Sequence, residues 1–221
     1  MVKKMYKAVI FDLDGTLTDT LDDLADAVNH VLTQYGFATR SREEVRSFVG
    51  NGLYRLMRRS LPAEVSDADA QVYTQQLTAY YKAHALDKTK PYEGIVPLLE
   101  KLNARGVVCA VATNKRETAA VDICRHFFGE LVVLVKGDNG TRPLKPDKAC
   151  IDEILQELHL AKEDVLYVGD SEPDAYTARN AGLQGVGVLW GFRSAEQLRE
   201  AGFDKLAGNC EELFNVVENF S

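Results

Sequence analysis

Short runs of apolar residues recur along the chain, and most of them are rich in β-branched side chains. None alternates cleanly with polar residues, which is typical of strands that are buried on both faces of a sheet. The pattern predicts five strands, at Ala8 to Phe11, Val107 to Ala112, Leu131 to Val135, Val165 to Val168 and Gly185 to Leu189.

Helical patterns separate these runs. Apolar residues recur at helical spacing from Ile95 to Leu102, with Gly106 as a stop signal, and again from Ile151 to Leu158. Strands and helices that alternate in this order form βαβ units, which build a parallel sheet covered by helices. We therefore predict an α/β fold with a Rossmann-like parallel sheet core.

The stretch from about Leu21 to Leu86 contains no convincing strand and reads as an all-helical insert. Its first helix follows an apolar stripe that Gly36 closes, and its second follows a capping box of Ser41 and Glu44. The prediction is a core domain of residues 1–18 and 90–221 and a helical domain of residues 19–89. We expect its four helices over Leu21 to Tyr35, after Ser41, over Leu53 to Ser60, and from Ser66 towards His84.

The composition of the chain limits the kinds of partner that we expect it to bind. With 221 residues and 46% apolar side chains, the chain is long enough for one sizeable core and a modest second module. A net charge of −7 argues against nucleic acid, and no apolar run is long enough to cross a bilayer. The basic segment from Met1 to Lys7 meets Asp12 and Asp14 too soon for a secretory signal. We expect a cytoplasmic protein, a monomer or homodimer, that acts on a small molecule.

Cysteine and histidine offer no metal site. The four cysteines are scattered without a CxxC pair, as expected of reduced packing residues. The four histidines lack the spacing of metal ligands, and we interpret them as surface or packing residues.

Two carboxylates follow the first predicted strand. Asp12 and Asp14 flank Leu13, and Gly15 permits a sharp exit of the chain after them. Ligands bind at the carboxyl ends of the strands in open α/β sheets, and strand side chains two residues apart share a face. Both carboxylates are therefore expected to converge on one site.

Three further polar stretches match a known pattern in order. Ala112-Thr113-Asn114-Lys115 closes the second strand, Lys145-Pro146 is expected to open a helix, and Gly169-Asp170-Ser171-Glu172-Pro173-Asp174 closes the fourth strand. Together with Asp12-Leu13-Asp14-Gly15-Thr16, they resemble the haloacid dehalogenase superfamily of phosphohydrolases over nearly the whole chain. Lys145-Pro146 lacks the second proline that often follows in that superfamily.

The resemblance implies a site that transfers a phosphoryl group. Asp12 would be the nucleophile that forms an aspartyl-phosphate, and Asp14 the general acid and base. Mg²⁺ would be held by Asp12, the backbone carbonyl of Asp14 and Asp170, with Asp174 in support. Lys145 would offset the charge of the transferring phosphoryl group. Thr113 and Asn114 would bind that group through a hydroxyl and a backbone N–H.

The helical insert resembles the small cap of this superfamily, which closes over the site and reads the leaving group. Phe48 to Leu53 and Leu189 to Arg193 resemble the phosphoglycolate phosphatase branch, so 2-phosphoglycolate is a candidate substrate. Arg55 and Arg59 share one helix face, either as a contact for a substrate carboxylate or as a solvated cationic face. Trp190, the one tryptophan, is interpreted as a packing residue.

Other functions stay open. A phosphomutase of the same superfamily tends to carry a histidine where this chain has Leu24, and hydrolysis of nucleotides or pyrophosphate fits the same motifs. A regulatory or binding protein with a degenerate site is disfavoured, because all four motifs keep their reactive side chains. Three other cations are interpreted as solvated surface charges rather than as the motif lysine: Arg142, Lys136 and Lys148.

Overall fold

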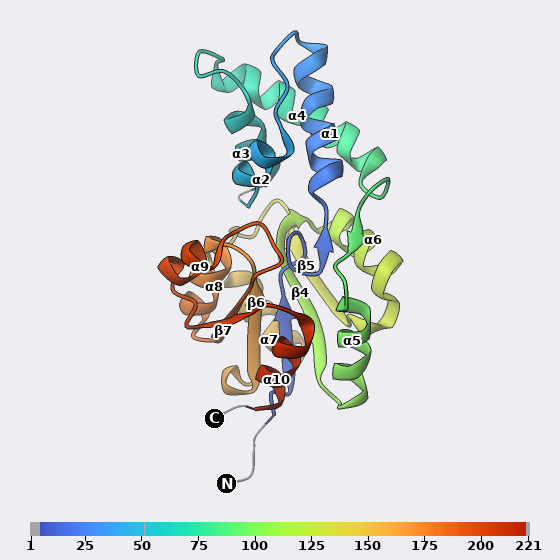
Figure 1. The fold of residues 1–221 in the computed structure, drawn as a ribbon, viewed down its shortest axis with the longest axis vertical. Helices are drawn as coiled ribbons and strands as arrows, with labels where there is room; N and C mark the ends of the chain where they lie inside the picture. The colour runs from blue at the N-terminus through green and yellow to red at the C-terminus, as the bar shows by residue number, and fades with distance from the viewer. Residues whose placement is uncertain (1–4, 51, 220–221) are drawn as a thin grey trace. The chain divides into compact units, whose positions relative to one another are not determined.

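The computed structural model describes residues 5–50 and 52–219. Its main sheet contains six parallel strands in the order β5-β4-β1-β6-β7-β8, which confirms the predicted α/β fold (Figure 1). The strands are β1 (Ala8–Phe11), β4 (Val108–Arg116), β5 (Leu134–Asp138), β6 (Val165–Gly169), β7 (Gln184–Val188) and β8 (Lys205–Ala207).

The central strand β1 is buried on both faces because its side chains alternate between two apolar clusters. Val9 and Phe11 pack with helices α5, α6 and α10 on one face, and Ala8 and Ile10 pack with α7 and α8 on the other. The continuous apolar run in the sequence thus reflects a sheet covered on both sides. The helices of this part are α5 (Ile95–Ala104), α6 (Glu117–Phe128), α7 (Ala149–Glu157), α8 (Glu172–Ala181), α9 (Ala195–Ala201) and α10 (Cys210–Glu218).

Three strand predictions differ from the structure. β4 continues to Arg116 through polar residues, because its end pairs with Asp138 of β5 after a shift in register. β5 begins later than predicted, since residues 129–131 form a 3₁₀ helix. β8 was not predicted, because it has three residues and Lys205 is exposed. Hydrophobic periodicity is a weak guide at polar strand ends and in edge strands of this length.

Residues 19–90 form a compact unit of their own, and the rest of the described chain forms the other. The four predicted helices are confirmed, and Ser41 and Glu44 form the predicted capping box. The segment Phe48 to Leu53, named above for its resemblance to the phosphoglycolate phosphatase branch, includes Asn51, which lies outside the described residues. The helices are α1 (Leu21–Gln34), α2 (Arg42–Phe48), α3 (Gly52–Ser60) and α4 (Asp67–His84), and the short strands β2 (Thr18–Asp19) and β3 (Lys90–Pro91) pair where the chain leaves and returns.

A buried carboxylate in the helical unit connects the start of α1 to the segment where the chain returns to the sheet. Asp23 lies in the first turn of α1 with 2% of its surface exposed. Its oxygens accept hydrogen bonds from the backbone N–H groups of Lys88 and Thr89 and from the Thr89 hydroxyl, at 2.7–3.1 Å. Buried polar groups need hydrogen-bond partners, and these donors supply them to the Asp23 carboxylate. Asp23 therefore fixes the start of α1 to the returning chain.

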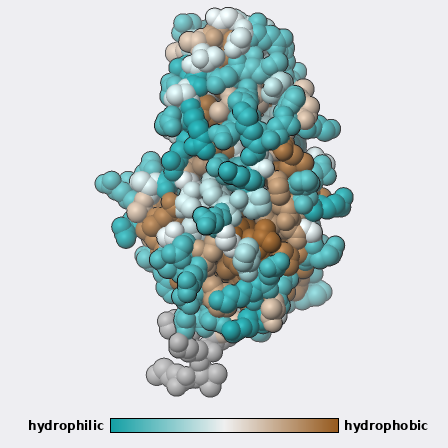
Figure 2. All heavy atoms as spheres, turned by 45° about the vertical axis from the view of Figure 1, so that its right-hand side comes forward, coloured by the Kyte–Doolittle hydropathy of each residue, from teal (hydrophilic) through white to brown (hydrophobic). Residues whose placement is uncertain are grey.

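Polar and charged side chains cover most of the face that Figure 2 shows, and apolar residues reach it in smaller areas. Among the described residues, no helix combines the length and the apolar character needed to span a membrane. The large apolar residues that are exposed come from separate elements of both units: Tyr35, Tyr54, Val72, Leu86, Val133, Leu144 and Leu189.

Candidate active site

The chain turns sharply after β1. The Leu13 carbonyl accepts hydrogen bonds from the backbone N–H groups of Thr16, Leu17 and Thr18, at 3.0–3.3 Å. Gly15 has a φ of +90° in this turn, and a Cβ there would lie 2.3 Å from Asp170 Oδ2. Only glycine fits this position, because any side chain would collide with the Asp170 carboxylate.

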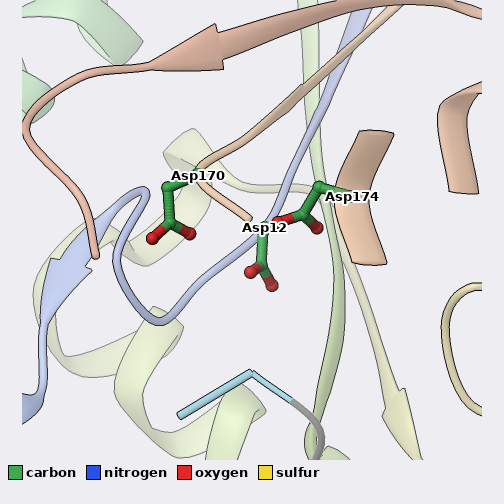
Figure 3. Close-up of side chains that lie close together, drawn as sticks. All are labelled: Asp12, Asp170 and Asp174. Atoms are coloured by element: carbon green, nitrogen blue, oxygen red, sulfur yellow. The ribbon is translucent and has the colours of Figure 1, made fainter. Parts of the chain in front are cut away.

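Three carboxylates from separate segments meet at the carboxyl end of the sheet. Asp12 follows β1, Asp170 follows β6, and Asp174 lies in the first turn of α8 (Figure 3). One oxygen from each lies within 4.8 Å of the other two, and the side chains are buried. The structure therefore brings together three of the four residues predicted to hold the metal. Asp14 does not add its carboxylate to this cluster.

Lys145 places one ammonium group against this acidic cluster. Its Nζ lies 2.8 Å from Asp12 Oδ1 and 2.7 Å from Asp174 Oδ1. The same group donates hydrogen bonds to the Tyr167 hydroxyl at 3.2 Å and to the Ala112 carbonyl at 3.1 Å. Burial alone lowers the pKa of Lys145, but Asp12 and Asp174 outweigh it and hold that pKa well above its ordinary value. Lys145 is therefore a buried, charged residue.

One lysine does not balance three buried carboxylates. Burial and the charge of Asp174 raise the pKa of Asp12 to about 7, although Lys145 acts in the opposite direction. Burial and the charges of Asp174 and Asp12 also raise the pKa of Asp170 well above its ordinary value. Carboxylate oxygens are ligands that hard divalent cations prefer, and such a cation would supply the missing positive charge. The donor set and its surplus of negative charge thus fit a magnesium ion.

The hydrogen bonds separate the roles of these carboxylates. Both oxygens of Asp174 are occupied, Oδ1 by Lys145 and Tyr167 and Oδ2 by the backbone N–H and hydroxyl of Ser171. Among the described residues, the buried Asp12 Oδ1 has the Lys145 ammonium group beside it but no hydrogen-bond donor, which leaves it available to a ligand or substrate. Asp174 is therefore suited to orient Lys145; its support of a metal stays a prediction.

A segment from the C-terminal part of the chain shapes the position of Asp170. The Phe192 backbone N–H donates to Asp170 Oδ2 at 2.7 Å, and the Trp190 indole N–H donates to the Thr16 carbonyl at 2.9 Å. A Cβ on Gly191 would lie 2.3 Å from Asp170 Cβ and 2.4 Å from the Gly15 carbonyl oxygen. Residues 190–192 thus fasten the turn after β1 to the carboxylate after β6. Trp190 packs against the core, and it also takes part in this arrangement.

Asn114 fixes the backbone of Lys145. Its side-chain oxygen accepts a hydrogen bond from the Lys145 N–H at 2.7 Å, and its amide donates to the Lys145 carbonyl at 3.2 Å. The predicted helix start at Lys145-Pro146 is wrong, because α7 begins at Ala149 and Lys145 lies in the preceding loop. Thr113 is buried, and its hydroxyl oxygen accepts a hydrogen bond from the Lys115 N–H at 3.2 Å.

A second acid–base pair involves Asp14. Lys115 Nζ lies 2.9 Å from Asp14 Oδ1 and 3.2 Å from Oδ2, so it engages both oxygens of that carboxylate. The Lys115 side chain is 6% exposed and that of Asp14 is 17% exposed. The two aspartates of the first motif therefore face different lysines, Asp12 towards Lys145 and Asp14 towards Lys115.

The other cations considered from the sequence lie in separate contacts. The interpretation of Arg142 as a solvated charge is wrong, because its side chain is 5% exposed and pairs with Glu117 and Glu153. Lys136 forms an ion pair with Glu157, and Lys148, which precedes α7, forms an ion pair with Asp152 of that helix. In the helical unit, Arg59 donates to the Phe48 carbonyl, whereas Arg55 makes no ion pair or hydrogen bond with the described residues.

Sequence reasoning missed three contributors to this site. Tyr167 carried a usable signal, since a tyrosine inside a buried aliphatic strand needs a polar partner for its hydroxyl. Gly191 and Lys115 lie inside sequence stretches that were singled out above, but neither residue was assigned a role. A close approach to Asp170 and an ion pair with Asp14 depend on contacts between distant parts of the chain.

Comparison with known proteins agrees with this arrangement. Residues 9–188 match the family model described as haloacid dehalogenase-like hydrolase. Phosphoglycolate phosphatase 1 of Pseudomonas aeruginosa is 30% identical over 97% of this chain and 81% of its own length. The phosphoglycolate phosphatase of Pseudomonas putida is 34% identical over 84% of this chain and 70% of its own length.

Solved structures share the whole fold. A protein of Lactobacillus delbrueckii subsp. bulgaricus, provisionally named a phosphoglycolate phosphatase, superposes with a TM-score of 0.94 at 28% identity and covers 98% of this chain and 100% of its own. A haloacid dehalogenase-like hydrolase from Streptococcus pneumoniae has a TM-score of 0.85 at 25% identity, covering 95% of this chain and 97% of its own. The chain therefore belongs to the haloacid dehalogenase-like hydrolase family, within its phosphoglycolate phosphatase-like branch of phosphatases.

Proposed function

We propose that this protein hydrolyses the phosphate monoester of a small metabolite through an aspartyl-phosphate on Asp12. The observation that carries the proposal is the buried cluster of Asp12, Asp170 and Asp174 around Lys145, at the carboxyl end of the sheet. A nucleophile that is itself negative needs nearby positive charge to approach a phosphate, and this cluster is built to hold such charge.

Magnesium would be held by the carboxylates of Asp12 and Asp170 and by the backbone carbonyl of Asp14. When bound, the ion offsets the negative charges of the nucleophile and the phosphoryl group. Asp174 supports the site through Lys145, because its own oxygens are filled by protein donors. Thr16 and Phe192 orient the Asp170 carboxylate, with donors at 3.2 and 2.7 Å.

The proposed reaction has two steps, the formation of the aspartyl-phosphate and its hydrolysis. In the first, an Asp12 oxygen forms a bond to phosphorus while the ester P–O bond breaks. The departing oxygen keeps the electron pair and takes a proton from Asp14. In the second, a water oxygen attacks phosphorus, Asp14 takes the proton of that water, and the bond to Asp12 breaks. Inorganic phosphate leaves, and Asp12 and Asp14 return to their starting states.

Positive charge and hydrogen-bond donors would stabilise the phosphoryl group during both steps. Lys145 offers the ammonium group, which Asp12 and Asp174 hold in place. Asn114 contributes by clamping the Lys145 backbone, and its own N–H and the Thr113 hydroxyl are proposed to bind phosphoryl oxygens.

The substrate we propose is 2-phosphoglycolate, on the strength of the names that the relatives carry. We further propose that residues 19–89 act as a cap that selects the leaving group. Arg55 is a candidate contact for the substrate carboxylate, since no described residue pairs with it.

The decisive assay is hydrolysis of p-nitrophenyl phosphate with Mg²⁺ and with EDTA. We expect turnover that depends on Mg²⁺ and that Asp12→Asn abolishes, because an amide is a poor nucleophile. Asp204→Asn, at an exposed position, is the matched control and should stay active. Equal rates in EDTA, or substantial activity in Asp12→Asn, would disprove the mechanism. A panel of 2-phosphoglycolate, sugar phosphates, nucleotides and pyrophosphate, ranked by kcat/KM, then identifies the substrate.

A further inference from the structure

Lys115 contacts the residue that is proposed to protonate the leaving group. Its ammonium group holds both oxygens of Asp14, at 2.9 and 3.2 Å. Asp14 is the residue proposed to hand a proton to the departing oxygen, so its carboxyl group must approach that oxygen during the reaction. A group that contacts Asp14 so closely therefore lies close to the residue that the leaving group has to reach.

The cations around the site differ in the partners that hold them. Lys145 is enclosed by the buried carboxylates of Asp12 and Asp174. Arg142 is held by Glu117 and Glu153, outside the acidic cluster. The partner of Lys115 is different, because Asp14 is the more exposed member of their pair and is itself the proposed general acid and base.

We propose that Lys115 is the subsite for a second anionic group on the substrate, a carboxylate one carbon from the ester oxygen. This inference rests on the proposed function and names the substrate class of the same site. A carboxylate at that place attracts the Lys115 ammonium and competes with Asp14 for it. Asp14 then turns to the departing oxygen, so a substrate that carries the carboxylate also aligns the residue that protonates its leaving group.

The Lys115–Asp14 ion pair should make the enzyme select between phosphate monoesters with and without a second charge. A phosphate monoester without a second charge leaves Lys115 with Asp14, and the substrate then offers no anionic group in exchange when the pair separates. Breaking a largely buried ion pair without such an exchange is unfavourable. Esters that carry the carboxylate should therefore react faster, through kcat as well as KM, because the effect includes the placement of Asp14.

A comparison of two substrates measures the effect of the carboxylate on the rate of hydrolysis. 2-Phosphoglycolate and 2-hydroxyethyl phosphate have the same chain length, and a CH₂OH group replaces the carboxylate in the second. We expect wild-type kcat/KM to favour 2-phosphoglycolate by at least about tenfold, the effect of one charge-assisted hydrogen bond. If the wild type hydrolyses both equally, the Lys115 inference is wrong and the proposed phosphatase function stands. If it hydrolyses neither ester but turns over p-nitrophenyl phosphate, the Lys115 inference is again wrong and the phosphatase function stands; if it hydrolyses none of the three, both are wrong.

Variants assign the preference to Lys115. Lys115→Met keeps the length of the side chain and removes its charge, so the ratio of the two kcat/KM values should approach one. Arg116→Met is the matched control, since it removes one charge at the next residue, where Arg116 pairs with Asp138. That variant should keep the wild-type ratio. Thermal unfolding checks that each variant is folded, and Lys115→Arg should restore part of the preference. A ratio that Lys115→Met leaves unchanged contradicts the inference.

Discussion

Replacing Asp12 with asparagine should stabilise the metal-free protein at alkaline pH. Asp12 shares a buried space with Asp170 and Asp174, and Lys145 does not balance the three charges. Burial and Asp174 raise the pKa of Asp12 from its ordinary 3.8 to about 7. The folded protein therefore binds a proton at Asp12 that the unfolded chain has released, over the whole interval between these values.

This bound proton decides whether the stability of the folded protein rises or falls with pH. Because the folded state binds more protons between pH 3.8 and about 7, stability falls as pH rises through that interval. Above pH 7 the cost is complete, and the pKa difference sets its upper bound at about 4 kcal/mol. Local relaxation reduces this figure, so we expect a gain of about 1–3 kcal/mol for Asp12→Asn at pH 8, or several degrees in Tm. At pH 4 the gain should vanish.

The assay is thermal unfolding in EDTA at pH 4, 6 and 8, with Asp204→Asn as the exposed control. Adding Mg²⁺ at pH 8 should raise the Tm of the wild type more than that of Asp12→Asn, because the variant has lost one proposed ligand. An Asp12→Asn protein that is no more stable than the wild type at pH 8 without metal would refute the reasoning.

Three further substitutions test the surroundings of the site. Gly191→Ala inserts a Cβ 2.3 Å from that of Asp170, so it should cost about 1–3 kcal/mol of stability and weaken Mg²⁺ binding in calorimetric titration; normal values for both would contradict this packing. Tyr167→Phe removes a hydroxyl bonded to Asp174 and Lys145, and kcat/KM should fall about tenfold, whereas Tyr176→Phe serves as control. With phosphoglycolate as the substrate, Arg55→Ala should show a higher KM than the wild type, and an unchanged KM with every anionic substrate removes Arg55 as a contact.

The sequence predicted the central sheet because the strands that build it are short, apolar and buried on both faces. Ala8 to Phe11 is the plainest case, since all four residues are buried. The polar ends of the strands were harder to predict. β4 continues through Thr113 to Arg116, where pairing with β5 outweighs the local preference of the residues. Propensity and periodicity describe one segment at a time, whereas a strand end depends on its neighbour.

The gathering of Asp12, Asp170 and Asp174 followed from their places after parallel strands and at a helix start, which meet at one edge of the sheet. The partners of these residues did not follow. The pairing of Lys115 with Asp14 and the burial of Arg142 with two glutamates each depend on which side chains the fold brings opposite a charge. No local pattern encodes that choice.

The central claim is that Asp12 carries the phosphoryl group, and trapping that group tests it most directly. Protein mixed with p-nitrophenyl phosphate and Mg²⁺ is quenched in acid, digested and analysed by mass spectrometry. Asp14→Asn should accumulate the intermediate, because nitrophenolate leaves without a proton whereas the second step needs a base. We predict a phosphoryl group on the peptide that contains Asp12 in the wild type and more of it in Asp14→Asn. Turnover without any phosphoryl group on Asp12, or with one on another residue, would contradict the account.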